Sequence, residues 1–233
     1  GSRGNSTAGF RPLAVTWCPI CASAVAYDRR VDGRVLTFGT SGKLADDALV
    51  MYDRETESEW KQPLGKAIKG PLDGHELSVV PASVTSWEQF RSDYLDGIVL
   101  QPVHGGDGDS RGESPRTVYE MTPYERYDAA EGFGLREMRG EGRERSWDRE
   151  DIDAKTVVLG ITHGGDAVGY PVGQVQNAGG VVSDTVGDLD VLVVSSGDDI
   201  HAFEDPGYEF ELREGTLYGD GAKWNTTTGR SDD

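Results

Sequence analysis

Apolar residues in this chain occur in short runs that are separated by turns rich in glycine and aspartate. Residues 13–17 (LAVTW) and 23–27 (SAVAY) are the first two runs, and residues 31–34 (VDGR) place Asp-Gly between these runs and the apolar run that begins at Val35. Asp-Gly in such a setting is a strong signal for a β-hairpin turn. Further short runs lie at 35–38, 49–53 and 77–81. The pattern predicts short antiparallel strands.

The second part of the chain also has short apolar runs separated by turns, and one predicted helix precedes it. Residues 86–94 begin with a serine suited to a helix N-cap and place aromatic residues on one face, which predicts a helix. Apolar runs then return at 157–161, 167–170, 191–194, 201–203 and 208–212. We therefore predict a mainly β fold, an α+β chain with few short helices.

The two ends of the chain repeat an order of elements. An apolar strand, a second strand ending in an aromatic residue and an acidic turn lie at 13–15, 26–27 and 44–47, and again at 191–193, 202–203 and 217–220. In both copies a hairpin precedes the acidic turn. The repeated order predicts a pseudo-symmetric, two-copy β architecture. The first copy carries two cysteines where the second carries Ser195 to Asp198.

Composition and turn spacing suggest one domain after a short N-terminal segment. We expect residues 1–11 to be a flexible N-terminal segment and residues 12–233 to form a single domain. Its first half spans about 12–127 and its second about 156–233, with a connector at about 128–155 that is rich in arginine and glutamate.

The charge balance excludes several partners. The 233 residues carry 23 Lys and Arg against 41 Asp and Glu, a net charge of −18. Such a chain is poorly suited to bind nucleic acid. No apolar run reaches the ~18 residues of a membrane span. An acidic, lysine-poor surface is typical of proteins from salt-loving archaea, so we interpret the charge as adaptation to concentrated salt; the alternative is an acidic surface for a cationic partner.

Cys18 and Cys21 form a C-x-x-C pair, and they are the only cysteines. The pair can supply half of a metal site, for copper or zinc. It can instead be a redox-active dithiol, because this spacing lowers thiol pKa values and permits a small disulfide ring. A third interpretation is a structural or interaction domain with inert, buried thiols. The metal-binding module is our first hypothesis, and the thiol oxidoreductase is the second.

Two histidines are candidates to complete a metal site. His104 and His163 each begin the sequence HGGD, which places them on glycine turns where they can reach a transition metal held by Cys18 and Cys21. Polar turns without a ligand role are the alternative.

Tyr-Asp-Arg occurs twice, each time at the end of an apolar run, and gives the pairs Asp28–Arg29 and Asp53–Arg54. The preferred interpretation is a strand cap with an ion pair. The functional alternative is a polar pocket floor in which arginine binds an anion. The identity of a protein or small-molecule partner does not follow from these residues.

Four phrases of the chain resemble the uncharacterised family DUF3179: VTWCPICASAVAYDR at 15–29, VDGRVLTFGTSGKL at 31–44, LVMYDRETESEW at 49–60 and GKAIKGPLDG at 65–74. The chain is similar to a haloarchaeal member. The resemblance implies continuity of fold rather than an activity.

The chain departs from that family where a Tyr-Pro element and a His-Glu pair are expected shortly before the cysteines. The similar segment at 160–187 has Gln174 to Asn177 in place of the His-Glu pair. If that histidine is a metal ligand in the family, this chain lacks it. No secretory signal is visible, and we favour an extracytoplasmic location, with the leader absent from this chain, over a cytoplasmic one.

Overall fold

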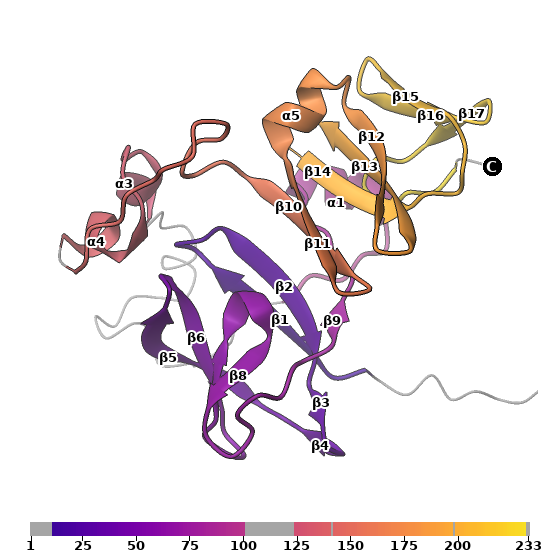
Figure 1. Ribbon diagram of the computed structural model, residues 1–233. Coiled ribbons are helices and arrows are strands. Elements are labelled where there is room, and N and C mark those ends of the chain that lie inside the picture. The colour runs from indigo at the N-terminus through magenta and orange to yellow at the C-terminus, as the bar shows by residue number, and fades with distance from the viewer. Residues whose placement is uncertain (1–10, 101–123, 141, 198, 232–233) are drawn as a thin grey trace, which may run out of the picture. The chain divides into compact units, whose positions relative to one another are not determined.

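The computed structural model describes residues 11–100, 124–140, 142–197 and 199–231 (Figure 1). The chain divides into two compact units. Unit 1 comprises Gly1–Ala82 and Tyr119–Ser146, and unit 2 comprises Ser83–Val118 and Trp147–Asp233. Both units consist of small antiparallel sheets, so the predicted mainly β fold is confirmed. The domain boundaries expected from the sequence stay a prediction.

Unit 1 begins with a three-stranded sheet in the order β1-β2-β9. Its strands are β1 (Leu13–Cys18), β2 (Ser23–Asp28) and β9 (Val79–Val80). The predicted hairpin at 31–34 is confirmed, because β3 (Arg30–Val31) pairs with β4 (Arg34–Val35). Cys18 is the last residue of β1, and Cys21 lies in the turn that follows it.

A four-stranded sheet completes the β structure described in unit 1. It runs in the order β5-β6-β7-β8 and consists of β5 (Phe38–Ala45), β6 (Ala48–Asp53), β7 (Glu59–Lys61) and β8 (Lys66–Lys69). The 3-10 helix η1 (Gln62–Leu64) connects β7 to β8, and the helices α3 (Glu125–Asp128) and α4 (Gly134–Arg139) also belong to this unit.

The core of unit 1 forms around Trp60 and Tyr27, which are fully buried. Trp60 meets Phe38 edge-on, with ring centroids 5.7 Å apart. The Tyr27 hydroxyl donates to the Gln62 carbonyl at 2.7 Å, and burial raises the pKa of Tyr27 to about 12. Gly65 lies in the left-handed region at φ 60°, and a Cβ there would be 2.5 Å from the Tyr27 ring, so both the turn and the packing require glycine.

The described part of unit 2 has two short helices and three small sheets. The helix α1 (Trp87–Asp93) is the one predicted at 86–94, and the Ser86 hydroxyl caps it by accepting from the Gln89 amide at 3.1 Å. The sheets are β10 (Val158–His163) with β11 (Asp166–Pro171); β12 (Val181–Val186), β13 (Leu189–Ser196) and β14 (Asp199–Glu204); and β15 (Phe210–Arg213), β16 (Thr216–Gly219) and β17 (Ala222–Trp224). Helix α5 (Val172–Asn177) follows β11.

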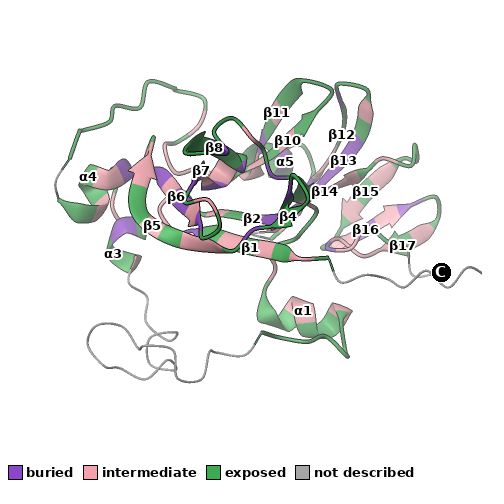
Figure 2. Cartoon of the chain, turned by 90° about the horizontal axis from the view of Figure 1, so that it is seen from below, coloured by how far each residue is buried: buried purple, intermediate pink, exposed green. Residues whose placement is uncertain are grey.

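The segments that suggested an internal repeat both form antiparallel hairpins, β1–β2 and β13–β14. Their surroundings differ, because β13 pairs on both sides and its residues Val191–Ser195 are buried. β1 lies at the edge of its sheet and alternates between exposed and half-buried positions, as Figure 2 shows. The two-copy symmetry itself stays a prediction.

No helix among the described residues has the length and apolar character needed to cross a membrane.

Candidate dithiol site

The two cysteines lie in the turn that connects β1 to β2. Cys18 ends β1 opposite Ser23, the first residue of β2, and the residues between them form the turn. Pro19 fixes its own backbone angle, and Ala22 adopts φ 44°, so the turn is tight. Neither cysteine is in a disulfide; Cys18 is buried and Cys21 is exposed.

The Cys18 sulfur is surrounded by hydrogen-bond donors. The thiol of Cys21 makes the strongest contribution, and the backbone amides of Cys21, Leu49 and Ile20 add to it. Together they outweigh the burial of the sulfur and lower the pKa of Cys18 from 9.0 to about 6. Hydrogen bonds to the charged form of an acid favour ionisation, and backbone amides supply them without a charged partner.

The same contact has the opposite effect on Cys21. Its thiol proton is held by the Cys18 sulfur, and both this hydrogen bond and burial raise the pKa of Cys21. Two coupled groups titrate as a pair, so the first proton to leave belongs to both sulfurs. Near neutral pH the pair therefore carries one negative charge and one shared proton.

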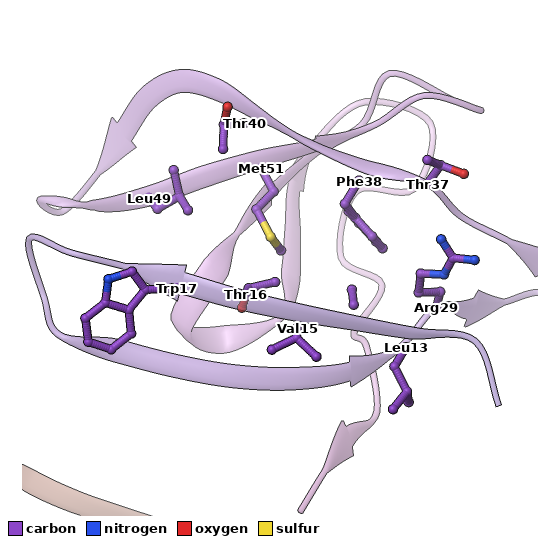
Figure 3. Close-up of a pocket in the computed structure, with 11 residues that line it drawn as sticks. Leu13, Val15, Thr16, Trp17, Arg29, Thr37, Phe38, Thr40, Leu49 and Met51 are labelled. Carbon is purple, nitrogen blue, oxygen red and sulfur yellow. The ribbon is translucent and has the colours of Figure 1, made fainter. Parts of the chain in front are cut away.

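A groove of about 360 Å³ lies between β1 and the strands β5 and β6 of unit 1 (Figure 3). One wall is β1, from Leu13 to Trp17. The other is formed by β5 and β6, which contribute Phe38, Thr40, Leu49 and Met51. Trp17 and Arg29 lie toward opposite ends, and Trp17 immediately precedes Cys18 in the chain. One end of the groove therefore lies at the residue before Cys18.

The structure describes only one of the two histidines that were predicted as metal ligands. His163 lies in unit 2, where its Nε2 is 2.9 Å from an Asp188 carboxylate oxygen. His104 lies outside the described residues. Within the described part of the chain, no three His, Cys, Asp or Glu side chains are grouped so that they could hold a metal ion.

In the first Tyr-Asp-Arg sequence, Asp28 and Arg29 have different surroundings. Asp28 is buried and binds Arg30 at 2.5 Å and Arg11 at 2.9 Å, and these contacts, Arg30 first, hold the pKa of Asp28 well below its usual range. Arg29 lies instead along the groove. The ion pair expected at this strand end thus uses Arg30 and Arg11.

The second Tyr-Asp-Arg sequence is an internal hydrogen-bond centre. Asp53 is fully buried and accepts from the Trp60 indole at 2.9 Å and from the Thr56 amide at 2.6 Å. Arg54 is exposed, and its backbone amide donates to the Thr37 carbonyl at 2.9 Å.

Sequence reasoning missed the groove and the Leu49 amide that helps to hold the Cys18 thiolate. Leu49 is distant from the cysteines in sequence, so spacing gives no sign of the contact. The sequence contains one sign of the groove, since apolar residues stand at alternate positions 13, 15 and 17. In the structure Leu13, Val15 and Trp17 are 43%, 82% and 53% exposed.

A strand-rich chain with a C-x-x-C turn and no grouped metal ligands among the described residues defines a β protein with a free dithiol. It belongs to the family described as "Protein of unknown function (DUF3179)", whose model matches residues 5–222. Neither the curated proteins nor the solved structures contain a match to the chain.

Proposed function

We propose that Cys18 and Cys21 are a redox-active dithiol that exchanges electrons with disulfides. The observation that supports this function best is the hydrogen bond between the two sulfurs, together with the lowered pKa of Cys18. Sulfurs that share a proton lie close enough to form a small-ring disulfide, and an ionised sulfur is the nucleophile that thiol–disulfide exchange requires.

The exposure of the two residues assigns their roles. Cys21 is exposed, so its sulfur is the one that an external disulfide R–S–S–R′ can reach. The proton of the Cys21 thiol first passes to the Cys18 thiolate along the hydrogen bond between the two sulfurs. The Cys21 thiolate then attacks R–S, the S–S bond breaks, and R′–S⁻ leaves and takes up a proton from solvent. Cys18 then loses its proton and attacks the Cys21 sulfur, which releases R–S⁻. Two electrons and the one shared proton pass from the protein to the partner disulfide, and solvent supplies the second proton.

The test is a count of reactive thiols in protein purified without chelator. We expect both cysteines to be reduced and unmasked, and both to be lost after addition of one equivalent of oxidised glutathione. Cys18→Ser and Cys21→Ser are matched controls, because each removes one sulfur and can form only a mixed disulfide. Thiols that resist oxidised glutathione until the protein is denatured would support the inert interpretation instead.

A second candidate is a soft or borderline transition metal, copper or zinc, held by the same two sulfurs. It is supported by the ionised Cys18 and the adjacent Cys21, since thiolates favour such metals. Structural zinc normally takes four ligands, so His163 or His104 would have to contribute. In the same thiol count, a metal site would show thiols that react only after chelation, with metal released in proportion.

We also propose that the chain is a haloarchaeal protein whose charge is an adaptation to salt. The net charge of −18 supports this, because such a charge repels itself in dilute buffer. The screening length falls from ~10 Å at 0.1 M salt to ~3 Å at 1 M.

Thermal melts in dilute and in multimolar KCl test the salt proposal. We expect the Tm to rise by roughly 10 °C or more, equivalent to about 3–5 kcal/mol for a chain of this size. The rise should shrink at a pH where the carboxylates are protonated. Equal melting temperatures at the two salt concentrations would contradict the proposal.

A further inference from the structure

β1 has one free edge. Within the described residues it pairs with β2 alone. The Arg29 amide donates to the Pro12 carbonyl at 3.0 Å, which makes this pair a hydrogen-bonded one. Bonded and non-bonded pairs alternate along an antiparallel ladder. The backbone N–H and C=O groups of Leu13, Val15 and Trp17 therefore point away from β2.

β5 has a free edge of the same kind. Among the described strands it pairs with β6 alone, and the bonded pair Thr37–Arg54, at 2.9 Å, sets the alternation. The backbone groups of Phe38 and Thr40 therefore point away from β6. Both residues line the groove opposite β1, so two unpaired strand edges border the same groove (Figure 3).

The β1 edge lacks the usual protection. Natural proteins guard exposed edge strands with charged residues, prolines or bulges. β1 reads LAVTWC, with no charge and no proline, and its pairing with β2 has no bulge. An edge left unguarded next to a reactive dithiol is suited to receive another strand.

At the far end of the groove, the Arg29 guanidinium has one unpartnered donor atom in the described part of the chain. The Nε atom of Arg29 is buried and has no hydrogen-bond partner among the described residues. Leu13 and Trp17 are separated along β1 by four residue steps, or about 13 Å of extended strand. A strand bound along β1 would therefore place side chains at Arg29 and at the cysteine turn that are four or five residues apart.

We propose that this groove binds an extended segment of a partner polypeptide, which adds as a strand to the free edge of β1. The segment presents a disulfide to Cys21 at one end and an acidic side chain to Arg29 at the other. The proposal rests on the proposed dithiol function and names its substrate class. Main-chain hydrogen bonds give such a complex its affinity, and the pockets at the ends give its specificity.

The charge of the protein restricts the acidic element to one site. A net charge of −18 opposes a partner that is acidic throughout. Arg29 therefore selects a single carboxylate in a segment that is otherwise uncharged, which also fits the apolar walls of the groove.

The experiment compares peptide and small-molecule disulfides. The probe is an eight-residue peptide whose other side chains are uncharged, with one cysteine in a disulfide to a thionitrobenzoate chromophore and one glutamate four residues away. The rate of chromophore release is measured with the wild-type chain, and the symmetrical thionitrobenzoate disulfide is the small control. We expect the peptide to react at least tenfold faster than a scrambled peptide in which a proline interrupts the strand.

Val15→Pro tests the strand pairing directly. Its N–H points to the free edge, so proline removes no bond to β2, and proline is tolerated at such edge positions. We expect about a tenfold slower reaction with the peptide, as for loss of one hydrogen bond, and an unchanged reaction with the small disulfide. Val15→Ala, which keeps the N–H, should stay within about twofold. Circular dichroism melts show whether each variant folds.

Arg29→Gln gives a second, independent test. It should slow chromophore release from the glutamate peptide about tenfold. The rate for a peptide with glutamine in place of glutamate should stay unchanged. Equal rates for all peptides and variants, with normal small-disulfide chemistry, would overturn the groove proposal alone. No reaction with either disulfide would overturn the dithiol function. A dimer in sedimentation that Val15→Pro dissolves would show that a second copy of the chain occupies the edge instead.

Discussion

Replacing Cys18 by serine should raise the pH at which Cys21 is alkylated at half its maximal rate by more than two units. In the wild-type chain the pair loses its first proton near the lowered pKa of Cys18, about 6. Without Cys18 the thiol of Cys21 has no neighbouring sulfur, and its pKa should return to the ordinary thiol value of about 8.5. Rates of iodoacetamide reaction across the pH range measure both midpoints.

Cys21→Ser is the matched control for this experiment. It leaves Cys18 buried, so alkylation should be slow at every pH in the folded chain. The ultraviolet absorbance of the thiolate provides a second readout that does not depend on access. A wild-type midpoint near 8.5, or one that Cys18→Ser does not move, would show that the two sulfurs do not share a proton.

Asp53→Ala should destabilise unit 1 by about 3–5 kcal/mol. The carboxylate is fully buried and accepts from the Trp60 indole, the Thr56 amide and the Thr56 hydroxyl. Alanine leaves the Trp60 indole and the Thr56 amide without partners, while the Thr56 hydroxyl keeps its contact with the Ser58 hydroxyl at 2.7 Å. It also removes the hydrogen bond to Trp60 in the core. Urea unfolding followed by tryptophan fluorescence measures the change.

Two control variants separate this effect from simple loss of charge. Glu76→Ala removes a carboxylate whose ion pair with Lys66 is exposed, at 3.3 Å, and it should cost less than about 1 kcal/mol. Asp53→Asn keeps an acceptor oxygen, so its loss of unfolding free energy should lie between those of Asp53→Ala and Glu76→Ala. If Asp53→Ala costs no more than Glu76→Ala, the network around Asp53 does not stabilise the fold.

Much of the fold follows from local sequence signals. Asp32-Gly33 forms its hairpin because Asp32 and Gly33 both take positive φ, at 49° and 74°, which this turn requires. Ser86 caps α1 because its hydroxyl can reach the Gln89 amide. The apolar runs form strands since burial of one face stabilises them.

The candidate site follows less completely, because its decisive contacts are distant in sequence. The spacing of Cys18 and Cys21 predicts that their sulfurs converge, but the Leu49 amide reaches Cys18 only after β6 has folded beside β1. Arg29 and Asp28 are adjacent in sequence and still separate: Asp28 binds Arg30 and Arg11, while Arg29 lines the groove. Adjacent residues on a strand point to opposite faces, and that alternation separates such pairs.

The most direct measurement of the central claim is the mass of the chain after reaction with one equivalent of oxidised glutathione, followed by peptide mapping. We expect a product that is lighter than the reduced chain by two hydrogen atoms and contains a bond between Cys18 and Cys21, which dithiothreitol reduces. A stable glutathione adduct on Cys21, with Cys18 still reduced, would contradict it, because the two sulfurs would then be unable to close the ring.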